Sequence, residues 1–176
     1  EGNTPGEGDT PDTPSGGNTD GDIDWNNTGL DGLALIYNNK ARFQVVYTAE
    51  SGAMALEIAN TFVARLRELK IEVADPVPDT DASKVAECEI IIGLNAQNRG
   101  EELSIQYRAL GNDGFAIKTV GTKIVIAGGS DTRLDNTYRS YLKDQMGITN
   151  KTKKLTELAV STDENETAEI FRRLCG

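Results

Sequence analysis

The run from Leu110 to Ile148 constrains the fold of this 176-residue chain more than any other stretch. Apolar residues alternate through 115–118 and again through 124–127, which predicts two strands. Val120-Gly121-Thr122-Lys123 between them suits a tight turn. A Gly-Gly pair ends the second strand. An amphipathic helix capped by Ser130 or Asp131 follows, with its apolar face formed by Leu134, Tyr138, Tyr141, Leu142 and Met146, and Gly147 ends it.

A second helix and a buried strand precede this run. Residues 51–70 place apolar side chains at helical spacing, with Ser51 as a candidate N-cap. The stripe consists of Met54, Ile58, Phe62, Leu66 and Leu69. The continuous apolar run Glu89–Leu94 predicts a central strand covered on both faces, and Gly93 lets the chain leave it at close quarters.

Shorter elements complete the predicted fold. Residues 33–37 and 43–47 alternate as strands and could pair as a hairpin. Residues 155–160 suggest one more short strand, and 168–174 could form a last short helix. The sequence thus predicts an α+β fold, a mixed or antiparallel sheet of about five strands with two main helices packed on one face.

The first 28 residues have a different composition, rich in Gly, Pro, Thr and Asp, with no Lys or Arg. Such a segment predicts a disordered, flexible acidic linker, followed by a single domain over 29–176 whose best-supported part is 33–148. Its acids account for most of the net charge of −10: Glu1, Glu7, Asp9, Asp12, Asp20, Asp22 and Asp24. We attribute them to solubility. The overall charge predicts no nucleic-acid partner.

Several chemistries are excluded or disfavoured by residue type. The chain has no histidine, which excludes Ser-His-Asp and Cys-His catalysis as usually built and His-ligated zinc. Asp20, Asp22 and Asp24 have calcium-loop spacing, but Trp25 stands where such a loop needs Gly. We therefore predict no metal and no cofactor.

Cys88 and Cys175 could pair in an oxidising compartment, although a buried free thiol is expected for Cys88, at the start of an apolar strand.

The setting of the chain is predicted from the same features. No run of about 18 apolar residues is present, so no membrane-spanning helix is expected. No charged-then-apolar leader is visible at the start of the sequence. A Thr/Pro/Gly/Asp linker ahead of a domain is typical of a secreted protein or a lipoprotein held off the cell surface. We therefore expect an extracytoplasmic location.

Two passages together resemble a known family. EIIIGLNAQNRGEEL, residues 89–103, resembles the IIIG-x-x-x-x-R passage of the small domain that precedes the barrel in family 20 β-hexosaminidases and family 67 α-glucuronidases. GNDGFAIKTVGTKIVIAGGSDTRLDNTYRSYLKDQMGI, residues 111–148, resembles that domain's closing hairpin and helix. The helix of residues 51–70 and the strand 43–47 stand in matching order, so the resemblance covers roughly 33–148.

The resemblance implies a sheet with two helices on one face and a noncatalytic accessory role beside a catalytic domain of the same longer polypeptide. It transfers no catalytic residue, because the working carboxylates of those enzymes lie in the barrel, which this chain lacks. One departure is Tyr138, which is followed by Arg139 rather than the family's usual Gly.

The sequence leaves three functions to compare. The first is an accessory or scaffold domain of an extracellular carbohydrate-processing protein. The second is a stand-alone carbohydrate-binding or protein-interaction module of a cell-surface protein, for which aromatics at 6% give little support. The third is a hydrolase using Glu101-Glu102 or Asp131-Asp135. Adjacent helical acids do not converge across a cleft, so we expect no enzyme activity and no catalytic residue.

If a binding site exists, it should lie where polar loops leave the carboxyl ends of strands. The candidate residues are Asn95, Asn98 and Arg99 after the central strand, and Asp131 and Arg133 after Gly129. Glycan is the candidate ligand. The alternative is that Arg99 and Asp131 form a structural ion pair.

Overall fold

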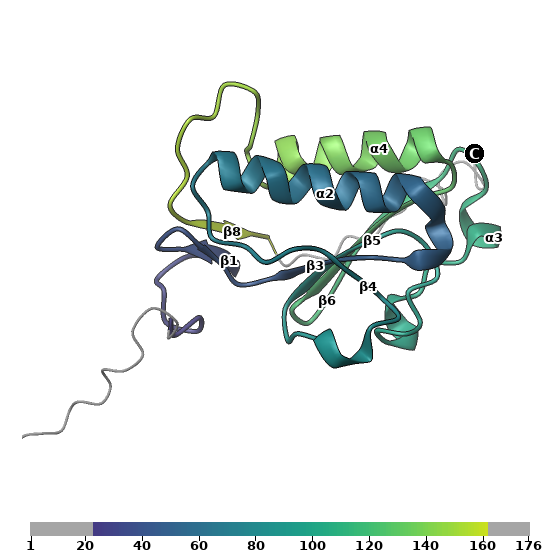
Figure 1. Ribbon diagram of the computed structural model, residues 1–176, viewed down its shortest axis with the longest axis horizontal. Helices are drawn as coiled ribbons and strands as arrows, with labels where there is room; N and C mark the ends of the chain where they lie inside the picture. Colours follow the sequence, from purple (N-terminus) through teal and green to yellow (C-terminus); the bar gives the residue numbers. More distant parts are fainter. Residues whose placement is uncertain (1–22, 162–176) are drawn as a thin grey trace, which may run out of the picture.

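The computed structural model describes residues 23–161, which form a five-stranded sheet, a three-stranded sheet and helices (Figure 1). The strands are β1 (Leu33–Tyr37), β2 (Lys40–Ala41), β3 (Gln44–Tyr47), β4 (Val77–Pro78), β5 (Glu89–Ile92), β6 (Phe115–Val120), β7 (Lys123–Gly128) and β8 (Leu158–Val160). The α-helices are α2 (Gly52–Glu68), α3 (Tyr107–Leu110) and α4 (Asp131–Ser140). This is the α+β fold that the sequence predicts.

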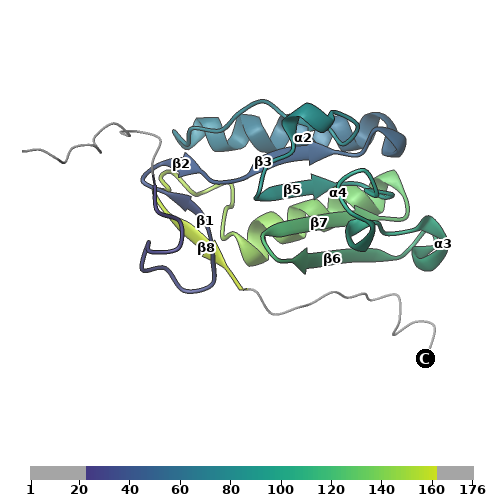
Figure 2. The same ribbon diagram turned by 90° about the horizontal axis from the view of Figure 1, so that it is seen from below.

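The larger sheet has the strand order β4-β3-β5-β7-β6, with β6 antiparallel to β7 and the other pairs parallel (Figure 2). All four residues of β5 are buried, which confirms the prediction of a central strand. The register places Glu89 beside Lys123 and Ile90 beside Ile124. Since side chains alternate between faces, Glu89 and Lys123 share one face and the isoleucines share the other.

Helices α2 and α4 lie side by side over one face of the larger sheet (Figure 1). The predicted stripe of α2 packs inward there: Ile58, Phe62 and Leu66 are buried against Ile90 and Ile92. The Phe62 ring stacks on Phe43 with centroids 5.8 Å apart and meets the edge of Tyr138 at 5.7 Å. Phe62 therefore joins both helices to the sheet.

The opposite face is covered by short segments rather than long helices. Val46, Ile91 and Val125 of the sheet form a second apolar cluster with Leu103 and Leu110. These two leucines come from a 3-10 turn and from α3. The stretch between β5 and β6 therefore covers this side of the sheet.

The hairpin predicted between residues 33–37 and 43–47 is wrong. β1 pairs with β2 and with β8 in the smaller sheet, while β3 lies in the larger sheet beside β5. Asn38 and Asn39 both have positive φ, 54° and 64°, and form a two-residue turn. This turn brings Lys40 opposite Tyr37 and Ala41 opposite Ile36, so the chain has already left the smaller sheet when β3 begins at Gln44.

Both ends of α2 and the start of α4 agree with the predicted helix termini to within two residues, but α4 ends at Ser140, before the predicted Gly147. Ser130 is the side-chain cap of α4 and accepts from the Arg133 N–H at 3.1 Å. Ser51 is the N-cap residue of α2, but its hydroxyl bonds elsewhere. After Ser140 the chain continues as a π-helical turn, Tyr141–Gln145. None of the described helices is long and apolar enough to cross a bilayer.

Some predictions fall outside the described residues. These are most of the acidic linker, including Asp20 and Asp22 of the calcium-like spacing, the helix at 168–174, and Cys175 with its possible disulfide. Cys88 is described: it is a free thiol, 2% exposed, as expected from its place before β5.

Candidate functional site

The carboxyl ends of β3 and β5 lie next to each other, and the segments that follow are tied together there. The Thr48 and Ser51 hydroxyls are 2.6 Å apart, and the Leu94 N–H donates to Ser51 Oγ at 2.9 Å. Gly93, with φ 123°, leaves room for this contact: a Cβ there would lie 2.0 Å from Thr48 Oγ1. At the predicted glycine exit from β5, the backbone of Gly93 thus lies close against the side chains of Thr48 and Ser51.

Asn95 and Asn98, two of the candidate residues, join the same edge. Asn95 Nδ2 donates to Glu50 Oε1 at 3.1 Å, and Asn98 Nδ2 donates to Asp79 Oδ2 at 3.0 Å. The other oxygen of Asp79 accepts from the Ala49 N–H at 2.9 Å. The loops after β3, β4 and β5 therefore form one hydrogen-bonded edge.

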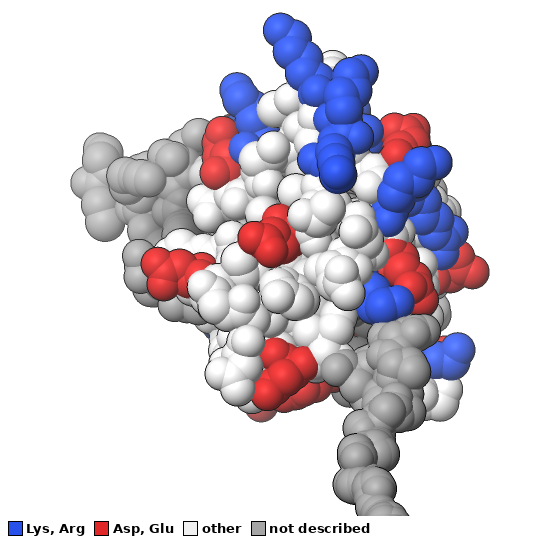
Figure 3. All heavy atoms as spheres, turned by 90° about the vertical axis from the view of Figure 1, so that its left-hand side faces the viewer, with Lys and Arg blue, Asp and Glu red and all other residues white. Residues whose placement is uncertain are grey.

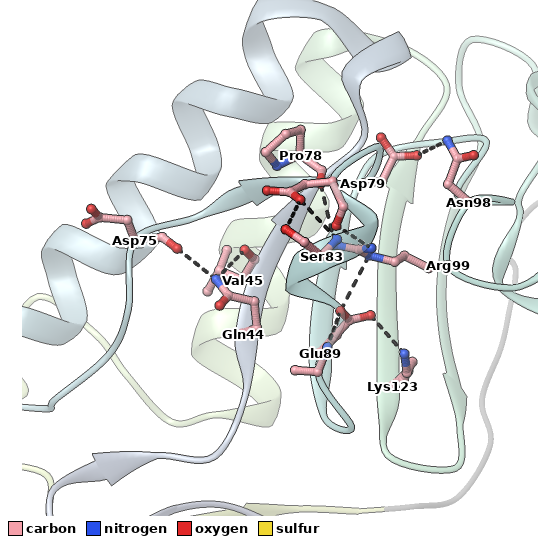
Figure 4. A network of polar contacts seen from close by, with 12 residues as sticks. Gln44, Val45, Asp75, Pro78, Asp79, Ser83, Glu89, Asn98, Arg99 and Lys123 are labelled. Carbon is pink, nitrogen blue, oxygen red and sulfur yellow. Dashed lines mark hydrogen bonds and ion pairs between the residues drawn. The ribbon is translucent and has the colours of Figure 1, made fainter.

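Arg99 lies below this edge, on the loop-covered face, with a fully buried side chain (Figure 4). Its Nη1 donates to the Asp81 carbonyl at 3.2 Å and its Nη2 to the Pro78 carbonyl at 3.4 Å. Its Nε is 3.4 Å from Glu89 Oε2, an ion pair without hydrogen-bond geometry to any described residue. Arg99 thus pairs with Glu89, and the predicted structural ion pair between Arg99 and Asp131 is wrong.

Glu89 is the centre of this buried group. Its carboxylate has no exposed surface; one oxygen accepts from Lys123 Nζ at 3.0 Å and the other from the Ala86 N–H at 3.0 Å. The register of β5 and β7 places Lys123 beside it. Two cations and a backbone donor around one buried carboxylate satisfy a charge that would otherwise be costly to enclose.

Asp131 and Arg133, the remaining candidates, start α4 after β7. Asp131 is exposed, and within the described residues it makes no hydrogen bond or ion pair with the other candidates. The Arg133 guanidinium lies 5.7 Å from the Phe115 ring centroid. The structure therefore brings Asn95 and Asn98 together, places Arg99 beneath them, and gives Asp131 and Arg133 separate surroundings.

The edge and the buried group beneath it also contain acids that the sequence analysis did not predict as site residues. Glu50 and Asp79 receive the two asparagines, and Glu89 holds Arg99. Glu89 could have been found from the sequence, because it is an acid in an otherwise apolar buried strand. The Ser83 hydroxyl and N–H lower the pKa of the nearby Asp81 carboxyl. No group of three or more acids and cysteines able to hold a metal is found among residues 23–161.

A groove of about 370 Å³ runs between α2 and α4 on their outer side. Met54, Ile58, Tyr138 and Leu142 contribute its apolar surface. Charged residues line it as well: Glu57, Arg65, Asp135, Arg139 and Lys143. Arg139 Nε contacts Asp135 Oδ2 at 2.8 Å, so part of this charge is internally paired.

Fold and edge together define an α+β domain whose candidate site is internally hydrogen-bonded. No protein-family model matches the chain, and no curated protein matches it. Among solved structures, a GH20 β-N-acetylhexosaminidase from Streptomyces coelicolor A3(2) is similar, with a TM-score of 0.47 and 10% identity. The match covers 74% of this chain and 23% of that one, so the chain spans about a quarter of that protein's length. A likeness this distant supports no conclusion about activity.

Proposed function

We propose that this chain is a noncatalytic accessory or scaffold domain of an extracellular carbohydrate-processing protein. The observation that carries the proposal is the internal pairing at the carboxyl edge and in the buried group beneath it. Asn95, Asn98 and Arg99 bind Glu50, Asp79 and Glu89, so their polar atoms hold loops together. Such pairing stabilises a framework, whereas a catalytic pair must face a substrate.

The resemblance supports the same role. Its first passage coincides with β5 and the loop that carries Asn95 to Arg99, and its second with β6, β7 and α4. These are three of the five strands of the larger sheet and one of its covering helices, the parts that define a fold. A catalytic domain in the same longer polypeptide is the proposed partner. The extracytoplasmic location rests on the composition of residues 1–28.

Hydrolysis assays on the purified chain test this proposal. We expect no release of nitrophenol from aryl N-acetyl-β-glucosaminide or aryl α-glucuronide. Asp79→Asn should lower stability, because it sets an amide against Asn98. Turnover by the chain that disappears in Glu50→Gln or Asp79→Asn would refute the noncatalytic role. A full-length gene product without a catalytic domain would refute the accessory role.

The second candidate function is a carbohydrate-binding or protein-interaction module. One specific observation favours it, the groove between α2 and α4 with Met54 and Leu142 partly exposed beside charged residues. Apolar surface with a polar rim is the usual composition of a recognition surface.

A further inference from the structure

Exposed lysines gather at the end of the molecule where α4 ends. Lys143 follows α4, and Lys151, Lys153 and Lys154 lie in the loop that leads to β8; all four are exposed. Asp144 is the only acid between residues 143 and 154. Figure 3 shows Lys and Arg gathered over the upper part of this end. The overall negative charge of the sequence conceals this local excess of positive charge.

The loop that carries Lys151, Lys153 and Lys154, called the lysine loop below, is held in a fixed shape by the rest of the domain. Arg65 Nη2, from α2, donates to the Thr149 carbonyl at 2.6 Å and to the Thr152 carbonyl at 3.0 Å. Asn39 donates its backbone N–H to the Thr156 carbonyl at 3.0 Å. The loop is thus anchored on both sides of Lys153, which lowers the entropy lost when a ligand binds it.

These lysines are not neutralised within the described part of the chain. No ion pair or hydrogen bond of their ammonium groups is found there. The ion pairs found among residues 23–161 involve other cations, such as Lys40 with Glu72 and Arg139 with Asp135. A fixed loop with three unpaired cations is a surface complementary to a negatively charged partner.

The groove continues from this loop and limits the shape of the partner. Arg65, Lys143, Thr149 and Asn150 line the groove, and Lys151 follows directly in the chain. We propose that a linear polysaccharide bearing carboxylate or sulfate groups binds here, its sugar rings in the groove and its acid groups on the lysines. This binding role is additional to the scaffold role, and either can fail without the other.

Other anionic partners fit less well. A bilayer is flat and does not enter a groove, and the described exposed large apolar side chains, Leu56, Val85 and Tyr107, all lie outside the lysine loop. Single-stranded nucleic acid needs exposed rings for stacking. The aromatic residue in the groove, Tyr138, is only 5% exposed.

Binding measurements on the full chain test the proposal. Labelled oligogalacturonate and heparin oligosaccharide represent the carboxylated and sulfated ligands. We expect saturable binding of at least one, weakening between about 50 and about 200 mM salt. Lys153→Ala with Lys154→Ala should weaken it about tenfold, and Glu57→Gln, which removes an acid from the groove, should strengthen it about twofold.

The control keeps the change in net charge constant. Lys84→Ala with Arg108→Ala removes two exposed cations from other parts of the surface and should change affinity less than about twofold. Equal losses in both double variants would reduce the effect to net charge and overturn the proposal. No saturable binding of either saccharide at low salt would also overturn it. So would tighter binding of phosphatidylserine vesicles or of an oligothymidylate.

Discussion

The two faces of the larger sheet differ in what covers them and in the residues they enclose. On the face under α2 and α4, the sheet contributes Ile90, Ile92, Ile124 and Ile126 to an apolar core. On the opposite face, Ile91 and Val125 share the surface with Glu89 and Lys123, and Arg99 is buried among them.

The difference follows from backbone hydrogen bonding. A helix satisfies its own interior N–H and C=O groups, so it can cover apolar side chains without polar partners. A loop leaves such groups open. Arg99 donates to the carbonyls of Pro78 and Asp81, and Glu89 accepts from the Ala86 N–H. The buried charges therefore satisfy the polar backbone groups of the loops. We expect substitutions on the two faces to lower stability for different reasons, loss of apolar packing on one and loss of polar partners on the other.

Removing the central ring of the helix-covered face should have the largest effect. Phe62→Ala should lower the free energy of unfolding by about 4 kcal/mol, because a ring 2% exposed leaves a cavity between Phe43 and Tyr138. Urea unfolding followed by circular dichroism measures it.

The matched control is Leu56→Ala, since Leu56 lies on α2 but is 38% exposed. We expect it to cost less than about 1 kcal/mol. Similar losses in both variants would mean that α2 does not pack on the sheet through Phe62.

On the loop-covered face, Arg99→Met should cost about 3 kcal/mol. It leaves two loop carbonyls without their donor and leaves Glu89 with Lys123 as its single cation. Arg108→Met, at an exposed arginine of α3, should stay within about 0.5 kcal/mol of the parent.

A double-mutant cycle with Glu89→Leu sharpens this comparison. If the buried charges act together, Arg99→Met with Glu89→Leu should cost at least about 1 kcal/mol less than the sum of the single changes. Strict additivity would show that Arg99 acts through the Pro78 and Asp81 carbonyls alone.

The helix-covered face could be predicted from sequence, and the loop-covered face largely could not. Spacing alone predicts which side of α2 is buried, and alternation assigns Ile124 and Ile126 to one face and Val125 to the other. Periodicity is a local signal, and a helix on a sheet depends on little else. The domain boundary near residue 29 stays a prediction.

The candidate site is a different case, because its contacts join distant segments. The sequence places Arg99 after a strand end, but its partners lie at residues 78, 81 and 89, and no spacing rule connects them. The Asp79 contact with Asn98 likewise depends on β4 lying beside β3. Whether Asn95, Asn98, Arg99, Asp131 and Arg133 bind a ligand also stays a prediction.

A smaller effect is expected where the two strand ends meet. Ser51→Ala removes the acceptor of the Leu94 N–H and the partner of Thr48 Oγ1, and should cost about 1 kcal/mol. The Ser140→Ala control changes an exposed serine of α4 and should be nearly neutral. Hydrogen exchange at Leu94 should accelerate in Ser51→Ala alone. Unchanged exchange there would show that this contact does not hold the edge.

The smallest effect at neutral pH should come from the titrating groups enclosed on the helix-covered face. Burial raises the pKa of Cys88 to about 12 and that of Tyr138 to about 12, and it raises the pKa of Tyr141 as well. The unfolded chain loses these protons first as pH rises, because its thiol and phenol titrate near 9 and 10. Stability should therefore be complete below pH 9 and fall as pH rises toward 12.

The stability of Tyr141→Phe should fall less steeply than that of the parent in urea unfolding at a series of alkaline pH values. Tyr107→Phe, at an exposed tyrosine, should follow the parent curve. Parallel curves for the parent and Tyr141→Phe would mean that Tyr141 ionises as freely in the folded protein as in the unfolded chain, and that the helices do not enclose it.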